Sequence, residues 1–373
     1  MANDPRASGL PFDTTGPVVP TQYWHVLPDG RIQCDVCPRE CKLREGQQGL
    51  CFVRAREGDR IVLTSYGRSS GFCVDPIEKK PLNHYLPGTP ILSFGTAGCN
   101  LACKNCQNWS ISKSREVDTL ADAASPEKLA RTAKSLGCSS MAFTYNDPVV
   151  FHEYAIDTAQ ACHEAGLKAV AVTAGYQSPA PRAEMYRWMD AANVDLKAFT
   201  EEFYYKNCGG HLQPVLETLE YLKKETKVWF EITTLLIPDE NDSEKEIEEE
   251  TQWIMEHLGP DVPLHFTAFH PDFKMMDKAH TPPATLTRAR RIALKNGLRY
   301  VYTGNVHDTD GGTTSCHSCG AKLIVRDWYR ILAWNLTGDG RCKKCGTPCA
   351  GVFDGPPGDW GPKRMPVMMQ TEA

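Results

Sequence analysis

Short β-rich apolar runs alternate with longer segments of helical periodicity between about residue 90 and residue 303. Seven runs have the length and composition of buried strands: residues 91–96, 140–145, 168–173, 193–198, 228–237, 264–269 and 299–303. Such alternation is typical of repeated βα units around a parallel sheet. Six or seven units predict an α/β fold, a partial or near-complete (β/α) TIM-like barrel, with its chemistry at the C-terminal ends of the strands.

The helical segments carry start and stop signals. Ser125 stands in the N-cap position of a helix predicted over 126–136, with a proline as its first residue. A second helix is predicted over 150–165, where Gly166 ends it. A third, over 243–258, has acidic residues in its first turns, where the helix dipole favours them.

The pattern divides the chain into five parts. Residues 1–25, rich in Pro, Gly, Asp and Thr, predict a flexible tail. Residues 26–90 hold a four-cysteine module and a lead-in loop, and residues 91–305 form the barrel. Residues 306–355 hold a second cysteine module, which a tail over 356–373 follows.

Composition excludes several classes of protein. Lys and Arg number 41 against 46 Asp and Glu, a formal net charge of −5, so no polybasic surface is expected for nucleic acid or an anionic membrane. The N-terminus has no signal-peptide pattern, and no apolar run approaches the roughly 20 residues that cross a bilayer. We therefore expect a cytoplasmic protein with no nucleic-acid or membrane partner.

Sixteen cysteines in a chain without an export signal indicate metal sites rather than disulfides, because cytosolic thiols are kept reduced. Twelve of them form three clusters: Cys34, Cys37, Cys41 and Cys51; Cys99, Cys103 and Cys106; and Cys316, Cys319, Cys342, Cys345 and Cys349. The other four stand alone and are expected to be small buried hydrophobes: Cys73, Cys138, Cys162 and Cys208.

The middle cluster, Cys99, Cys103 and Cys106, has the spacing C-x3-C-x2-C and follows the first predicted barrel strand. A structural zinc site or a ferredoxin cluster is closed by four ligands, whereas three thiolates on a [4Fe–4S] cubane leave one iron free for an exogenous ligand. Gly98 and Ala102 allow close backbone approach. Packing cysteines, or half of a shared zinc site, are the alternative interpretation, but both flanking clusters already hold four cysteines. The triplet therefore predicts a catalytic iron–sulfur site.

The chain resembles the radical SAM protein of the AmmeMemoRadiSam system, a relative of the pyruvate formate-lyase activating enzymes, in five ordered motifs: GTAGCNLACKNCQNWSISK, TYNDPVVF, VDLKAF, EITTLLIPDEND and HFTAFHPD. The resemblance runs from about Cys34 to Gly355. It implies a barrel of the radical SAM type and a [4Fe–4S] cluster whose open iron binds S-adenosylmethionine (SAM). It also implies reductive homolysis of SAM to methionine and a 5′-deoxyadenosyl radical that abstracts hydrogen. Many superfamily members have an aromatic residue before the last cysteine, where this chain has Asn105; Trp109 is the candidate to supply the missing stacking on adenine.

The resemblance also assigns the contacts to the amino end of SAM. Residues 144–148, which include Tyr145, Asn146 and Asp147, match an element whose backbone binds the SAM ammonium group in relatives. A turn with short polar residues before a proline exposes backbone carbonyls, which suits this role. A plain helix cap is the alternative.

Further SAM contacts are predicted on three later strands. Asp195 and Lys197 alternate with apolar neighbours, so both charges point to one face, and the resemblance matches them to a SAM-binding pair. A buried structural ion pair is the alternative. Thr233, which alternates with Glu231, and His270, at the end of HFTAFH, complete the predicted site, with a purely structural histidine as the alternative.

The C-terminal cysteines form two C-x2-C-Gly knuckles with a β-like run between them, the pattern of a zinc ribbon. Cys316, Cys319, Cys342 and Cys345 close a tetrahedral site for zinc, in preference to iron, and Cys349 is left over.

The N-terminal quartet of Cys34, Cys37, Cys41 and Cys51 is also enough to close one metal site, for zinc or for an auxiliary iron–sulfur cluster. Zinc is favoured, because an appendage of roughly 60 residues has little core and needs a metal to fold.

Three functions remain open. The favoured one is a radical SAM enzyme that modifies a small molecule or a protein, supplied by a one-electron donor such as flavodoxin or ferredoxin and acting with Memo-like and AMMECR1-like proteins. The second is an activase of a glycyl-radical enzyme. The third, a zinc-stabilised scaffold without catalysis, disagrees with the triplet and the SAM motifs.

Overall fold

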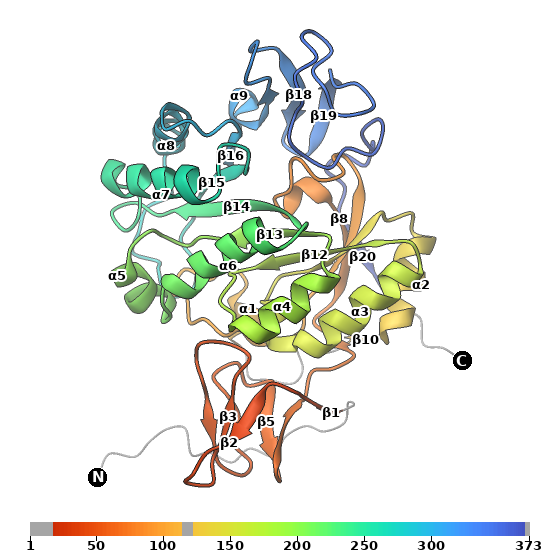
Figure 1. Cartoon of the computed structure of the whole chain (residues 1–373), viewed down its shortest axis with the longest axis vertical. Coiled ribbons are helices and arrows are strands. Elements are labelled where there is room, and N and C mark those ends of the chain that lie inside the picture. The colour runs from red at the N-terminus through yellow and green to blue at the C-terminus, as the bar shows by residue number, and fades with distance from the viewer. Residues whose placement is uncertain (1–17, 114–121, 370–373) are drawn as a thin grey trace.

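The computed structural model describes residues 18–113 and 122–369, which build one nine-stranded sheet and two small appendages (Figure 1). Seven consecutive neighbours in the sheet run parallel. They are β9 (Pro90–Phe94), β11 (Ser140–Phe143), β12 (Lys168–Thr173), β13 (Ala191–Asp195), β14 (Trp229–Leu236), β15 (Leu264–Ala268) and β16 (Val301–Gly304). All seven predicted strands are therefore confirmed, with ends that shift by up to three residues.

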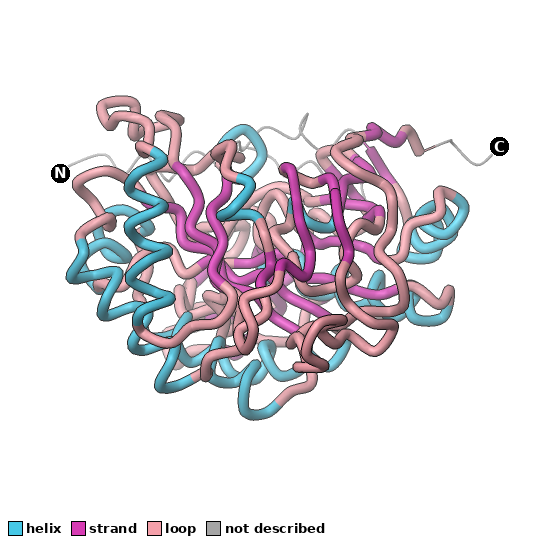
Figure 2. The backbone as a smooth tube through the Cα atoms, turned by 90° about the horizontal axis from the view of Figure 1, so that it is seen from above, coloured by secondary structure: helices cyan, strands magenta, loops and turns pink. Residues whose placement is uncertain are grey.

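The barrel is open. The sheet order is β16-β15-β14-β13-β12-β11-β9-β8-β20, so its two edges do not pair, and Figure 2 shows the strands as an arc with helices along its outer side. The partial form of the predicted barrel is the correct one. On the β9 side the sheet is extended by two antiparallel strands, β8 (Phe72–Pro76) and β20 (Met365–Val367). Neither was predicted: β8 lies in the expected lead-in module and β20 in the expected C-terminal tail.

The helices that cover the sheet begin and end close to their sequence signals. They are α2 (Pro126–Ser135), α3 (His152–Glu164), α4 (Pro179–Trp188), α6 (Gln213–Glu225), α7 (Glu244–His257) and α8 (Pro283–Lys295). Ser125 Oγ accepts a hydrogen bond from the Lys128 amide at 3.3 Å, and Ser243 Oγ accepts one from Glu246 at 3.2 Å, so both are N-caps. Shorter helices are η1 (Ile77–Lys79), α1 (Trp109–Ser112), η3 (Pro148–Phe151), α5 (Glu201–Phe203), η4 (Tyr204–Cys208) and α9 (Thr309–Gly312). No helix in the described part of the chain combines the length and apolarity needed to cross a bilayer.

The two cysteine modules lie at opposite ends of the molecule in Figure 1. The N-terminal module consists of two three-stranded sheets, ordered β1-β6-β5 and β2-β3-β4. Their strands are β1 (Val19–Pro20), β2 (Trp24–Val26), β3 (Ile32–Cys34), β4 (Lys42–Leu43), β5 (Arg54–Glu57) and β6 (Arg60–Leu63). The C-terminal module is the sheet β17-β18-β19, made of Thr314–Ser315, Lys322–Asp327 and Arg330–Trp334. A short ladder joins β7 (Arg68–Ser69) to β10 (Asp122–Ala123). Of the predicted 1–25 tail, residues 1–17 lie outside the described residues, whereas β1 and the start of β2 are paired strands.

Glu231, on β14, connects the parallel sheet to the lead-in loop through hydrogen bonds. Its buried carboxylate accepts hydrogen bonds from the backbone amides of Asn83 and His84, at 2.9 and 2.7 Å. His265 Nε2 lies 2.6 Å from it, and the Trp229 indole donates to it at 3.1 Å. Although burial raises its pKa, the hydrogen bond from His265 and the other neighbours hold the pKa of Glu231 below its usual range. The carboxylate is therefore ionised and fully paired.

We expect Glu231→Ala to lower the free energy of unfolding by about 3–5 kcal/mol, because it leaves several buried donors without an acceptor. Chemical denaturation measures this, with the exposed Glu217→Ala as the matched control, expected within about 0.5 kcal/mol of the parent. Because the folded-state pKa is lowered, this contribution is present above the unfolded pKa and is lost on acidification. The parent should therefore lose more stability than Glu231→Ala between about pH 5 and pH 3. Equal pH slopes would contradict the assignment.

Candidate functional site

A cavity of about 680 Å³ lies at the C-terminal ends of the parallel strands. This volume lies within the range of roughly 300–1,000 Å³ that is typical of small-molecule sites. Cys99, Cys103 and Cys106 line it together with the seven residues predicted to contact SAM from the 144–148 turn and the later strands: Tyr145, Asn146, Asp147, Asp195, Lys197, Thr233 and His270. Residues that span 171 positions of sequence thus converge on one cavity, from Cys99 to His270.

The loop that carries the triplet is packed tightly on two sides. Gly98 has a φ of +83°, and a Cβ there would lie 2.1 Å from the carbonyl oxygen of Cys51, so only glycine fits. On the other side, the amides of Ala102 and Lys104 donate to the carbonyls of Cys208 and Asn207, at 2.7 and 2.9 Å. The N-terminal module and η4 therefore both hold this loop in place.

Burial is the main influence on the pKa of two of the three thiols. It raises the pKa of Cys99 to about 12 and also raises the pKa of Cys106. Cys103 differs, because a side-chain hydrogen bond with Cys208 lowers its pKa to about 6 and raises that of Cys208. Cys208 was expected to be a packing cysteine and is buried, but it does not line the cavity. It therefore contacts the triplet on the side away from the cavity, and the cavity side of the three thiols stays open. No sequence spacing connects it with the triplet, because the contact depends on the π-helical turn of η4.

Asn146 connects β11 to the triplet loop. Its side-chain oxygen accepts from the Thr96 amide at 3.0 Å, and its amide nitrogen donates to the carbonyls of Ala97 and Gly98 at 3.0 and 2.9 Å. Asp147 caps η3 through the Val149 amide and also accepts from Thr173 and Ala174. Both side chains are thus hydrogen-bonded within the protein. It is the backbone around them that can contact a ligand in the cavity.

Asp195 and Lys197 form an ion pair with 2.5 Å between Nζ and Oδ2. Their side chains keep 31% and 23% exposure, and both line the cavity, so the pair is accessible to a ligand there. Although burial lowers its pKa, Asp195 holds the pKa of Lys197 above its usual range. Thr233 exchanges hydrogen bonds with Asn193 on the neighbouring strand, and half-exposed His270 lies 3.2 Å from Gln107.

Trp109, the candidate for adenine stacking, lies outside the cavity lining. Its ring stacks on Phe273 with 5.7 Å between centroids and 13° between planes, and its indole donates to Asp272 at 3.1 Å. One face of the ring is therefore already covered by protein.

A basic group that sequence analysis missed lines the cavity opposite the strand ends. Asp75 on β8 pairs with Lys79 and Lys80, at 2.8 and 2.7 Å, and with Arg364, at 3.4 Å. The Tyr145 hydroxyl donates to the same carboxylate at 2.8 Å. Although burial raises it, the lysines hold the pKa of Asp75 below its usual range, and burial lowers the pKa of Lys80 to about 8. The only sequence signal was the lysine pair in the lead-in loop; Arg364 reaches the site because β20 joins the sheet.

The C-terminal cysteines meet as predicted. Cys316 and Cys345 have 3.6 Å between their sulfurs, and Cys319 and Cys342 have 3.8 Å. Within the described ranges, these four form the only set of three or more Cys, His, Asp or Glu ligand atoms that all lie within 4.8 Å of one another. This arrangement can hold a tetrahedral metal ion. Cys349 is outside the set and lies 3.9 Å from His84.

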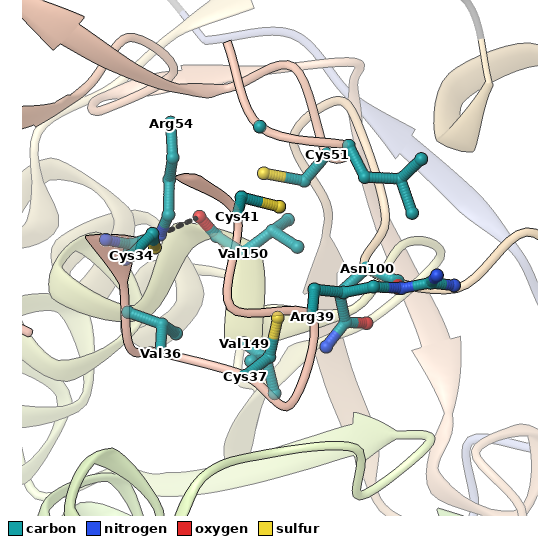
Figure 3. A pocket seen from close by; sticks show the side chains of 12 residues that line it. Cys34, Val36, Cys37, Arg39, Cys41, Cys51, Arg54, Asn100, Val149 and Val150 are labelled. Atoms are coloured by element: carbon teal, nitrogen blue, oxygen red, sulfur yellow. Dashed lines mark hydrogen bonds between the residues drawn. The ribbon is translucent and has the colours of Figure 1, made fainter. Parts of the chain in front are cut away.

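The N-terminal cysteines surround a separate small pocket, shown in Figure 3. It is enclosed by the module itself, by η3 and by Asn100 of the triplet loop. The four thiols that sequence analysis grouped together thus line one pocket, and a metal held there stays a prediction.

Comparison with known proteins places these observations in a family. The sequence model described as the Radical SAM superfamily matches residues 94–250. An uncharacterized protein of Methanocaldococcus jannaschii is 37% identical over 325 residues, which cover 87% of this chain and 96% of the relative. The 4-hydroxyphenylacetate decarboxylase activating enzyme of Clostridium scatologenes is 27% identical over 82 residues, 22% of this chain and 26% of that protein. Among solved structures, a radical SAM methyltransferase from Sphaerobacter thermophilus is 15% identical with a TM-score of 0.47, over 77% of this chain and 76% of that one.

We expect Asn146→Ala to lower the free energy of unfolding by about 1–3 kcal/mol and to reduce iron uptake at the triplet, because the 96–98 backbone loses its partners. Anaerobic reconstitution followed by iron analysis measures the second effect. Asn296→Ala, which removes one hydrogen bond to Thr251 far from the loop, is the control and should retain full iron uptake. Unchanged stability and iron content in Asn146→Ala would contradict the positioning role.

Proposed function

We propose that this chain, which belongs to the radical SAM superfamily, binds SAM against a [4Fe–4S] cluster held by Cys99, Cys103 and Cys106 and cleaves it reductively. The observation that carries the proposal is the single cavity in which the three thiols meet all seven residues assigned to SAM. A scaffold without catalysis has no need of this convergence.

The donor set fits the cluster. Three partly buried thiols face one cavity, and the nearby fourth cysteine, Cys208, lies outside the cavity lining. The three sulfurs are not drawn into the tight set that marks the C-terminal site, in keeping with ligands that each bind a different iron. A cluster bound here, with SAM on its open iron, would supply the electron that cleaves SAM to methionine and a 5′-deoxyadenosyl radical able to abstract hydrogen from a substrate.

The chain's own groups bind and orient SAM. The Lys197 ammonium binds the SAM carboxylate, and the Asp195 carboxylate binds the ribose or the amine. In the structure the two side chains pair with each other, so SAM binding replaces one contact of each side chain. The turn at 144–148, whose side chains are engaged elsewhere, presents its backbone to the SAM ammonium group. Thr233 and His270 border the remaining cavity wall.

Zinc is our assignment for the C-terminal thiols. Tetrahedral geometry with Zn–S bonds of about 2.3 Å places sulfurs about 3.8 Å apart, which agrees with the 3.6 and 3.8 Å found. Its role is to fold the ribbon, which has only a small core of its own.

The physiological setting follows from the five ordered motifs, which support membership of the AmmeMemoRadiSam system. On this proposal the enzyme acts in the cytoplasm with Memo-like and AMMECR1-like proteins and takes electrons from a flavodoxin or ferredoxin. Its substrate is a small molecule or a protein.

A glycyl-radical activase is the second candidate. The Clostridium scatologenes relative, named as an activating enzyme, favours it over 82 residues. A glycyl-radical EPR signal in a partner enzyme, formed after incubation with this protein, SAM and reductant, would decide for the activase.

Anaerobically reconstituted protein with dithionite and SAM should produce 5′-deoxyadenosine, and SAM should perturb its EPR signal. Cys103→Ala should lose both. A Cys103→Ala protein that kept the SAM-perturbed signal would overturn the proposal.

Asp195→Asn and Lys197→Met should each weaken SAM binding by about 1–3 kcal/mol, the range for hydrogen bonds to charged groups, or roughly 5-fold to 150-fold in Kd. Anaerobic equilibrium titration with SAM measures this. Lys168→Met, which removes an exposed ion pair with Asp190, is the matched control and should bind as the parent does. Unchanged SAM affinity in both variants would show that Asp195 and Lys197 form a structural ion pair and do not bind SAM.

Cys316→Ser should release about one zinc per chain and unfold the C-terminal ribbon. Metal analysis and limited proteolysis between residues 313 and 355 measure the two effects, with Cys349→Ser as the control that keeps zinc. The SAM-perturbed EPR signal should survive. Loss of triplet iron together with zinc would show that the two sites are not independent.

A further inference from the structure

We propose that Cys34, Cys37, Cys41 and Cys51 bind a second iron–sulfur cluster, of the [4Fe–4S] type, directly beside the loop that carries Cys99. This reverses the preference for zinc that the sequence alone supports. The reasons are the spacing of the four sulfurs, the pocket they enclose and their position against the triplet loop.

The four cysteines come from one hairpin and one turn. Cys34 ends β3, and its amide donates to the carbonyl of Cys41 at 2.9 Å, which closes the hairpin that carries Cys37 at its tip. Cys51 stands in the turn before β5, where the Phe52 amide donates to the carbonyl of Gly49 at 2.9 Å. Figure 3 shows the four cysteine side chains arranged around one pocket. A hairpin and a turn thus provide four ligands with no help from the rest of the chain.

The sulfur spacing separates the metal sites of this chain into two kinds. At the C-terminal site all four sulfurs lie within 4.8 Å of one another, as thiolates must when they share one ion. Within the parts of the chain that the structure describes, no three of the N-terminal thiols meet that limit, and neither does the triplet. Like the triplet, the N-terminal set therefore lacks the mutual closeness of four thiolates on one ion. Ligands of a cubane are wider apart because each binds a different iron.

The pocket that the N-terminal sulfurs help to line has a volume of about 20 Å³, more than the roughly 10–15 Å³ that admits one water. Four thiolates that share one zinc, each about 2.3 Å from it, leave no room for a water among them. Besides the cysteines, the lining is mainly apolar, with Val36, Leu50, Val149 and Val150, and such surroundings exclude water from a cluster.

Two cations flank the pocket. The Arg54 guanidinium is 2% exposed, bound to Glu153 at 2.5 Å and to the carbonyl of Val150 at 3.1 Å. Arg39 donates through Nε to the carbonyl of Asn100 at 2.8 Å, while its Nη2 is buried without a partner. Four thiolates with a dication or a cubane carry net negative charge, and buried cations beside them offset it.

The position of the pocket connects it with the triplet. The carbonyl of Cys51 packs against Gly98, one residue before Cys99, and Arg39 bonds to the residue after Cys99. The two sites therefore lie back to back with one layer of backbone between them. A redox-active metal at the first is in place to exchange electrons with the second.

The full-length protein should take up about eight irons and eight sulfides per chain on anaerobic reconstitution, together with about one zinc. A chain with Cys99→Ala, Cys103→Ala and Cys106→Ala should keep about four irons and give a reduced-cluster EPR signal that SAM leaves unchanged. Zinc in place of this iron, about two per chain in all, would overturn the proposal, and so would a triplet variant that binds no iron.

The reciprocal variant, Cys37→Ala with Cys41→Ala, should lose the SAM-insensitive signal and retain the SAM-perturbed one. Cys73→Ala with Cys138→Ala removes two thiols elsewhere and is the matched control, which should keep about eight irons. Each variant should keep the circular dichroism spectrum of the parent, which shows that it has folded. If the proposed SAM site fails instead, the reciprocal variant contains no iron while the triplet variant still contains four, so the two failures are distinguishable. Iron counts unchanged in the reciprocal variant would refute the N-terminal site.

Discussion

The hydrogen bonds between Asn146 and the backbone of residues 96–98 are the contact on which the site depends. A cysteine loop without secondary structure can follow many paths after a strand, and iron coordination tolerates few of them. Asn146 selects one by bonding one amide and two carbonyls directly before Cys99. Because it stands at the end of the neighbouring strand β11, the register of β9 against β11 also sets the position of the cluster ligands. The sheet thus places the metal as well as the substrate cavity.

The basic wall of the cavity is assembled from segments far apart in the chain. Asp75 brings together the lead-in lysines, Tyr145 at the end of β11 and Arg364 beside β20. The carboxylate is buried and ionised, so it stabilises the fold only while these cations and donors surround it. The cavity is therefore completed by residues beside the C-terminal strand.

The sequence predicts the parallel core because its strands are short, β-rich apolar runs that alternate with segments of helical periodicity. The residues expected around SAM came from the family resemblance, and the structure brings them to one cavity because the strand ends of a parallel sheet meet at one edge. The sequence does not predict β8, β20 or the contact of Cys208 with Cys103, because each depends on a long-range partner rather than on local pattern. FCVDP and MPV each contain a proline, which argues against a strand in sequence, and they form as antiparallel additions at the sheet edge, β8 on β9 and β20 on β8.

The same limit explains the N-terminal metal. The argument for zinc was that a module with little core needs a metal to fold, and the structure agrees on the small core: Ile32, Leu43 and Ile61 form one buried group, and Val36 joins Val149 in another. That argument favours any metal equally, because binding free energy is folding free energy whichever ion supplies it. Only geometry separates the candidates. The chain contains its own reference for a four-sulfur ion site, at Cys316 and its partners, and the N-terminal set does not match it.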